Sequence, residues 1–113
     1  MGRTAGNAYE YQTDVGVLIF NRVEELFEPI LTLLRSGPKP AWELEDDLAS
    51  RFKVSSPERR ALLRNGHRAW ENHVAWALSH LRRRRSVTKI TIQKAPDAAG
   101  AAYTSGTYNR RFG

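Results

Sequence analysis

The chain has 113 residues and a mass of 12.9 kDa, the size of one domain with one hydrophobic core. Hydrophobic residues make up 41% and charged residues 27% of the chain, a balance typical of folded globular proteins rather than disordered ones. The absence of cysteine excludes a disulfide scaffold, a cysteine-ligated zinc finger and a thiol nucleophile.

The formal net charge is +6, and it is divided unevenly along the chain. Residues 1–57 hold six Lys/Arg and nine Asp/Glu, a net −3, whereas residues 58–113 hold twelve and three, a net +9. A strongly basic half predicts a polyanionic partner, with nucleic acid as the first candidate. The N-terminus lacks the apolar core of a secretory signal, and no apolar run reaches the roughly 18 residues of a membrane span, so we expect a cytoplasmic protein.

Residues 1–20 are interpreted as an N-terminal extension. The first 13 of them are polar and predict an extended or frayed lead-in. The apolar run over residues 15–20 is too short for its periodicity to distinguish a strand from the start of a helix.

The first helix is predicted to begin with a capping box formed by Asn21 and Glu24. Its inner face consists of apolar residues at helical spacing: Val23, Leu26, Phe27, Ile30, Leu31 and Leu34. Pro29 should kink this helix, because proline lacks an N–H and clashes with the preceding turn. The Ser-Gly-Pro sequence at residues 36–38 should end it.

Three further helices are expected after a short edge strand or turn at residues 38–42. The first covers residues 43–52, and its inner face consists of Leu44, Leu48, Ala49 and Phe52. Ser55 as N-cap, with Pro57 in the first turn, predicts a short helix over residues 58–64, closed by Asn65-Gly66. The longest helix should cover residues 68–83. Its predicted inward residues are Trp70, Val74, Ala77, Leu78 and Leu81, with Arg68, Asn72, Ala75, Ser79 and Arg82 on the opposite face.

After Arg85 the period changes from helical to alternating. Thr88, Ile90 and Ile92 alternate with polar residues, which predicts a half-buried strand. Residues 95–102 suit a turn, and residues 103–108 a second strand. This order predicts a mainly α fold with a small β-hairpin, that is, an α+β winged helix-turn-helix domain over residues 21–108. Residues 109–113 are expected to form a basic tail.

Several positions follow a known family pattern. They are Trp42-Glu43-Leu44, Phe52-Lys53-Val54-Ser55 with Glu58-Arg59, Gly66, and the long-helix residues Trp70, Asn72, Trp76-Ala77 and Leu81. The long-helix residues fit the order aromatic-x-Asn-Arg-aliphatic-x-Trp-Ala-x-x-x-Leu, and Pro29 also matches. In these positions the chain resembles the N-terminal winged-helix domain of Mrr-type restriction endonucleases.

The chain departs from that pattern at three places. His73 stands where the family usually has Arg, Arg84-Arg85 stand where it has a Gly after the long helix, and the hairpin here is longer. These departures concern the mode of DNA contact more than the fold. The resemblance does not extend to the family's nuclease domain, so it implies a DNA-recognition module rather than cleavage.

The N-terminal part of the long helix is the predicted reading element. In a winged helix this part enters the major groove, where Arg pairs with guanine and Asn with adenine. The predicted base-contact residues are His67, Arg68, Glu71 and Asn72. A solvated face of a core helix is the alternative interpretation. Some winged domains read DNA with the hairpin, and Lys89 and Lys94 would then take that role. Trp76 lies off the central stripe and is predicted to be a packing residue.

A run of four arginines at the end of the long helix predicts phosphate contacts. Arg82, Arg83, Arg84 and Arg85 lie beside Lys89 and Lys94 of the hairpin. Such cations orient a protein on DNA without reading its sequence. Complementing the helix dipole would not need four of them, although a solvated charge run stays open. Arg59, Arg60 and Arg64 are predicted to make a second backbone contact.

Metal binding and catalysis are not indicated by the sequence. His73 and His80 are separated by about 10.5 Å along a helix, too far for one metal with bonds of about 2.1 Å, and His67 is no better placed. The acidic residues Glu43, Glu45, Asp46 and Asp47 spread around a short helix, and no phosphate loop or hydrolase motif occurs. We therefore expect no metal, no cofactor and no enzymatic activity.

The sequence thus predicts a module that binds double-stranded DNA, either as a free-standing transcription regulator or as the recognition domain of a restriction-type nuclease. A protein-interaction module without DNA affinity is the alternative, with a homodimer formed through residues 15–34. No membrane partner is expected.

Overall fold

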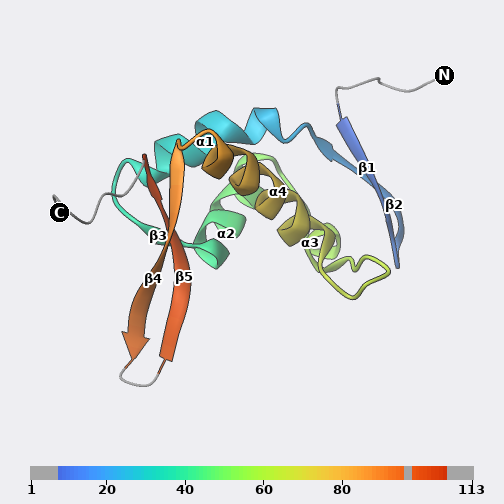
Figure 1. The fold of residues 1–113 in the computed structure, drawn as a ribbon. Helices are drawn as coiled ribbons and strands as arrows, with labels where there is room; N and C mark the ends of the chain where they lie inside the picture. Colours follow the sequence, from blue (N-terminus) through green and yellow to red (C-terminus); the bar gives the residue numbers. More distant parts are fainter. Residues whose placement is uncertain (1–7, 96–97, 107–113) are drawn as a thin grey trace, which may run out of the picture.

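The computed structural model describes residues 8–95 and 98–106, with the side chains of 9–90 and 101–106. This part of the chain contains four helices and two small antiparallel sheets. One sheet is two-stranded (β1-β2), and the other has the strand order β3-β5-β4. The sheets lie at opposite ends of the helical layer (Figure 1). The expected α+β class is confirmed.

An N-terminal hairpin precedes the helices. β1 (Ala8–Thr13) pairs with β2 (Gly16–Asn21), so that Tyr9 lies opposite Phe20 and Tyr11 opposite Leu18. These four side chains pack against the core. Residues 8–13 of the predicted lead-in are thus extended, but they form a paired strand rather than a frayed end, and the apolar run over residues 15–20 belongs to the turn and strand β2. Contacts with distant helices stabilise the hairpin, and a local pattern does not show such contacts.

α1 (Glu24–Leu34) begins differently from the prediction. Its N-cap is Val23, with no side-chain cap, and Asn21 is the last residue of β2. The Asn21 amide donates instead to the Glu25 carboxylate at 2.8 Å. The predicted Asn21–Glu24 capping box is therefore wrong, because the strand continues through Asn21. The helix contains Pro29 and buries Leu26, Pro29, Ile30 and Leu34.

The next segment confirms the edge-strand alternative. β3 (Lys39–Pro40) pairs with β5, and α2 (Ala41–Arg51) follows directly. α2 buries Leu44, Leu48 and Ala49, as the spacing predicted. The chain leaves the helix through Lys53, whose φ is +57°, and the Val54 N–H donates to the Ala49 carbonyl at 2.8 Å. This is a Schellman ending, which usually contains glycine at the left-handed position.

α3 (Ser56–Arg60) begins with the predicted Ser55 cap. The Ser55 hydroxyl accepts from the Glu58 N–H, and the Glu58 carboxylate accepts from the Ser55 N–H. The helix ends at Arg60, so its predicted extension to residue 64 is wrong. Leu62 forms a bridge with Arg68 instead, and its N–H donates to the Asp14 carboxylate at 2.9 Å. These contacts hold residues 61–68 in a loop against the hairpin turn.

α4 (Ala69–Arg83) is the longest helix, as predicted. All five residues of the expected inward stripe are buried, together with Ala69 and His73. The helix ends in a second Schellman motif, in which Arg85 has a φ of +62° and the Ser86 N–H donates to the Leu81 carbonyl at 2.9 Å. Glycine is the residue that the family pattern has after this helix.

β4 (Val87–Ala95) and β5 (Ala98–Ser105) form a longer hairpin than predicted. The expected turn at residues 95–102 is wrong, because Ala101 pairs with Thr91 and Ala102 with Ile90. The small residues of this segment favour turns locally, but pairing with the long β4 overrides that preference. Residues 107–108 of the predicted second strand and the predicted tail at 109–113 lie outside the described residues.

Trp70 lies within the core, where the N-terminal hairpin (β1-β2) and α2 meet α4. It is 1% exposed, and its ring meets that of Phe20 edge to face at 5.1 Å. Its indole N–H donates to the Glu45 carbonyl at 3.0 Å, which joins α4 to α2. None of the helices in the described residues is long and apolar enough to cross a membrane.

Candidate nucleic-acid interface

The exposed face of α4 is a narrow stripe opposite its buried face. It runs from the N-cap Arg68 through the half-buried Asn72, then Ala75, Trp76 and Ser79, to Arg82, so the predicted residues are joined by Trp76, which was expected to pack. Ala75 is exposed and Ser79 half-buried. Because Trp76 is exposed beside them, the middle of this face also presents a large apolar side chain.

A group of arginines lies at the N-terminal end of this stripe. Arg68 Nη1 lies 3.3 Å from Glu71 Oε2, and Arg59 forms an ion pair with Asp46. A cleft of about 240 Å³ opens here between α3 and α4. Its lining residues are Ser56, Arg59, Arg60, Arg68, Trp70 and Glu71. The structure thus brings Arg68 and Glu71, predicted as base contacts, together with Arg59 and Arg60, predicted as phosphate contacts.

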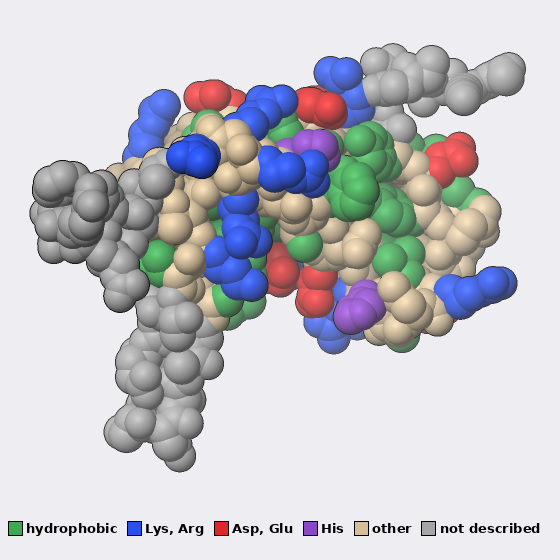
Figure 2. Space-filling view, viewed as in Figure 1, with side chains coloured by type: hydrophobic (Ala, Val, Ile, Leu, Met, Phe, Trp, Pro, Cys, Tyr) green, Lys and Arg blue, Asp and Glu red, His purple; other side chains and the backbone are tan. Residues whose placement is uncertain are grey.

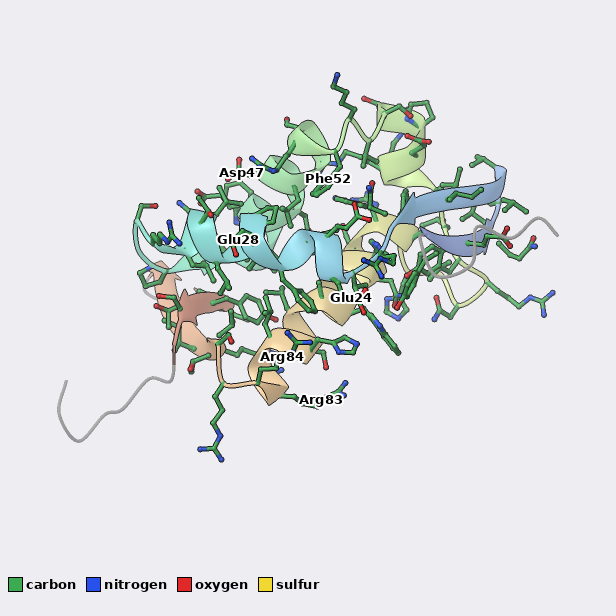
Figure 3. The ribbon with its side chains drawn as sticks, turned by 90° about the horizontal axis from the view of Figure 1, so that it is seen from above. Glu24, Glu28, Asp47, Phe52, Arg83 and Arg84 are labelled. Atoms are coloured by element: carbon green, nitrogen blue, oxygen red, sulfur yellow. The ribbon has the colours of Figure 1, made fainter. Side chains whose placement is uncertain are left out.

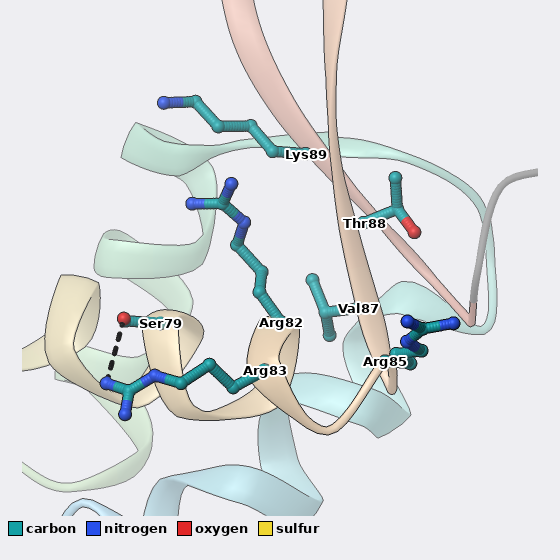
Figure 4. A pocket seen from close by; sticks show the side chains of 7 residues that line it. All are labelled: Ser79, Arg82, Arg83, Arg85, Val87, Thr88 and Lys89. Carbon is teal, nitrogen blue, oxygen red and sulfur yellow. Dashed lines mark hydrogen bonds between the residues drawn. The ribbon is translucent and has the colours of Figure 1, made fainter.

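A second group of cations surrounds the C-terminal end of α4. A cleft of about 490 Å³ is lined by Ser79, Arg82, Arg83, Arg85, Val87, Thr88 and Lys89. Arg82 and Lys89 extend to the same side of this cleft, whereas Arg85 points away beyond β4 (Figure 4). Arg83 Nη2 donates to Ser79 Oγ at 3.4 Å. The helix end and the hairpin base therefore contribute to one basic surface.

Some of the predicted phosphate contacts are not part of these groups. The Arg84 guanidinium lies over the Phe27 ring of α1, at 4.8 Å from its centroid, so the four-arginine run is divided. Arg83 and Arg84 are labelled at the end of α4 in Figure 3. Arg64 lines a separate cleft of about 520 Å³ beside the β1-β2 turn. The side chain of Lys94 lies outside the described residues.

Two other predicted base-contact positions do not line either cleft at the ends of α4. Burial raises the pKa of Tyr11, and a hydrogen bond from the Asn72 side chain partly offsets this rise. Asn72 therefore faces β1. His67 is exposed in the loop before the helix. Trp76, predicted to pack, is 48% exposed, and its ring centroid lies 5.8 Å from that of His80.

His73 is a buried polar residue whose structural role the sequence did not indicate. Its Nδ1 lies 2.8 Å from the Tyr11 hydroxyl and its Nε2 lies 2.6 Å from the Asn21 carbonyl. Burial lowers its pKa, so the neutral ring is favoured. The alternation of Tyr9 and Tyr11 was the sequence signal that could have indicated a strand covering this part of α4.

Glu45 is a second residue whose place was missed. Burial and, to a lesser extent, repulsion by Glu71 raise its pKa to about 7, against the attraction of Arg59 and Arg68. It therefore belongs to the same surface as the N-terminal arginine group. Acidic side chains lie among basic ones on the face shown in Figure 2. The sequence showed an acidic cluster on α2 but not which of its members faces α4.

The family comparison matches residues 24–92 to the model described as the Mrr N-terminal domain. No curated protein and no solved structure was found to match the chain. Within the described residues, no three His, Asp or Glu side chains are grouped so as to hold a metal ion.

Proposed function

Because this chain belongs to the Mrr N-terminal domain family, we propose that it is a winged helix-turn-helix module that binds double-stranded DNA. In this proposal α3 and α4 form the helix-turn-helix, α4 is the recognition helix, and the β4-β5 hairpin is the wing. The activity is recognition, within a restriction-type system, rather than cleavage.

The observation that carries the proposal is the arrangement of charge along α4. The stripe from Arg68 to Arg82 covers 15 residues, and its 14 steps of 1.5 Å give about 21 Å of helix axis. Cations flank both ends, with Ala75, Trp76 and Ser79 between them. A major groove is roughly 12 Å wide, so a helix lying in it would bring cations at its two ends to the phosphate walls.

The two sets of residues have different roles in this proposal. The base-contact set is His67, Arg68, Glu71 and Asn72, at the N-terminal end of α4. The phosphate set is Arg59, Arg60, Arg82, Arg83, Arg85 and Lys89. Phosphate contacts fix the position on the duplex, whereas base contacts select the sequence.

A salt titration tests the proposal. Binding of a fluorescent duplex, followed by anisotropy, should weaken linearly in log–log form as salt rises, with a slope of about −0.9 for each phosphate neutralised. A slope near zero, or the absence of binding at low salt, would overturn it.

The exposed face of the N-terminal hairpin favours a second function, a protein-interaction surface that forms a homodimer through residues 15–34. Val15, Val17 and Ile19 are each at least 50% exposed, on the side of β2 away from the core. Analytical ultracentrifugation of the wild type and of Ile19→Lys tests it. A dimer that the substitution dissociates supports this function, and a monomeric wild type at high concentration contradicts it.

A further inference from the structure

The loop between α3 and α4, residues 61–68, is folded back on itself. Two backbone hydrogen bonds, of 2.7 and 2.9 Å, close it on either side of an antiparallel bridge between Leu62 and Arg68. They join the Leu63 N–H to the His67 carbonyl and the Ala69 N–H to the Ala61 carbonyl. In a bridge flanked in this way, the N–H and carbonyl of Leu62 point away from Arg68, so their partners lie on the other side.

Asp14, in the turn between β1 and β2, is the partner of both groups. Its backbone N–H donates to the Leu62 carbonyl at 3.0 Å, and its carboxylate accepts from the Leu62 N–H at 2.9 Å. The second of these bonds is charge-assisted and belongs to the stronger class of hydrogen bond. The hairpin turn is thus paired with a segment that is itself paired with Arg68, the N-cap of α4. The loop lies beside the β1-β2 turn in Figure 1.

The N-terminal hairpin and the loop differ in their relation to the family. The loop belongs to residues 24–92, which match the family model, whereas β1 and β2 lie outside them. Asp14 is therefore a contact that the hairpin adds to the matched domain, at the end of the proposed recognition helix.

Arg64 lies at the tip of this loop. The Gly66 N–H donates to the Leu63 carbonyl at 2.9 Å, so residues 63–66 form a tight turn with Arg64 at its second position. Arg64 and Asp14 line the same cleft of about 520 Å³. Within the part of the chain that the structure describes, no carboxylate forms an ion pair with Arg64, and its guanidinium is exposed to a phosphate.

We propose that Asp14 is a positioning residue for DNA binding, which holds the α3–α4 loop so that Arg64 contacts the phosphate backbone. The inference rests on the proposed function, and it adds Arg64 to the phosphate set. A loop that is already ordered in the free protein loses less conformational entropy on binding, and its contacts then contribute more to affinity. The carboxylate of Asp14 acts through this order and does not touch the DNA.

The positioning role and a simple charge effect predict opposite signs. A carboxylate near the interface repels phosphates, so its removal should strengthen binding if Asp14 has no other role. In our proposal Asp14→Ala weakens binding, because the Leu62 N–H loses its acceptor and the loop is released. Asp14→Asn keeps an acceptor oxygen at the same place and removes the charge, so it should bind at least as tightly as the wild type.

Anisotropy titrations of a fluorescent duplex at several salt concentrations test the proposal, at a temperature at which thermal denaturation shows each variant to be folded. Asp14→Ala should bind severalfold more weakly than the wild type, and its log–log salt slope should fall by about one, as in Arg64→Ala. The double variant should be little weaker than either single variant, because both remove the same contact. Glu10→Ala, which removes an exposed acid from β1, is the matched control and should not weaken binding.

The possible failures are distinguishable. If Asp14→Ala and Asp14→Asn strengthen binding equally, with a normal salt slope in the wild type, Asp14 acts by charge alone and the positioning role is wrong. Fully additive losses for Asp14→Ala and Arg64→Ala would also contradict it. Absence of wild-type binding at low salt would overturn the proposed function together with this inference.

Discussion

Tyr11 of β1 and His73 of α4 are joined by a hydrogen bond of 2.8 Å across 62 residues of sequence. The other ring nitrogen, Nε2, lies 2.6 Å from the Asn21 carbonyl, which can only accept, so Nε2 carries the proton. Nδ1 of the neutral ring therefore accepts from the Tyr11 hydroxyl. One neutral imidazole thus connects both strands of the N-terminal hairpin to α4.

The first prediction is that acidification weakens this connection. Burial lowers the pKa of His73 in the folded protein. As pH falls below about 6.5, the histidine of the unfolded chain therefore takes up a proton before that of the folded chain, and the stability present above that pH is lost. The loss should not exceed about 1.4 kcal/mol per pH unit. The raised pKa of Glu45 has the opposite effect on stability between the pKa of this group in the unfolded chain and about 7. Urea unfolding should therefore be measured on the Glu45→Gln variant, in which this contribution is absent. His73→Gln on that background should flatten the profile between pH 7 and 5.5, and an unchanged slope contradicts the assignment.

The second prediction concerns the centre of the core. Trp70→Ala should lower the free energy of unfolding by about 3–5 kcal/mol, because it leaves a large cavity and removes the hydrogen bond from the indole to the Glu45 carbonyl. Trp76→Ala is the control on the same helix, and it should cost much less because its side chain is 48% exposed. Thermal denaturation of both variants measures the difference. Equal melting temperatures would show that the buried stripe is misassigned.

The third prediction concerns the end of α4. Arg85→Gly should raise stability by about 0.5–1 kcal/mol, since relief of the left-handed conformation outweighs the added freedom of the unfolded chain. Arg84→Gly should instead destabilise the protein, because Arg84 has helical angles and contacts Phe27. Denaturant midpoints of the two variants give the comparison. A loss of stability in Arg85→Gly would contradict the strain argument.

The fourth prediction separates the two kinds of arginine in the four-residue run. Removing Arg82 and Lys89 together should reduce the slope of log affinity against log salt by about two. Arg84→Ala should leave that slope nearly unchanged, because its guanidinium lies over Phe27. Anisotropy titrations at several salt concentrations make the test. Equal slope changes for Arg82 and Arg84 would mean that the cleft is not the phosphate site.

The fifth prediction identifies the reading element. Asn72→Ala should cost roughly 1–3 kcal/mol on a duplex selected for tight binding and much less on a scrambled one. Tyr11→Phe removes the hydroxyl that Asn72 contacts and controls for indirect effects of the hairpin. If the ratio of selected to scrambled affinity is unchanged in Asn72→Ala but falls in Lys89→Ala, the hairpin reads the DNA.

Local spacing was enough to predict much of the helical part of the fold. The inward stripe of α4 and the Ser55 cap of α3 depend on residues within one or two turns of each other, so their pattern is visible in the sequence. The N-cap of α1 was predicted wrongly, because strand pairing extends through Asn21. The β5 strand was predicted too short, because its small residues are held by the opposite strand rather than by their own propensity.

The sequence by itself determined the charge division, the buried face of each long helix and the family pattern around Trp70 and Leu81, since all of these are properties of neighbouring residues. Only the tertiary structure decided which exposed side chains meet. Tyr11 is hydrogen-bonded to His73, and the Arg84 guanidinium lies over the Phe27 ring. Arg82 and Lys89 line the same cleft, and Glu45 lies close enough to Glu71 to be repelled by it. The physical reason is that a helical pattern shows which residues are exposed but not which element packs beside them.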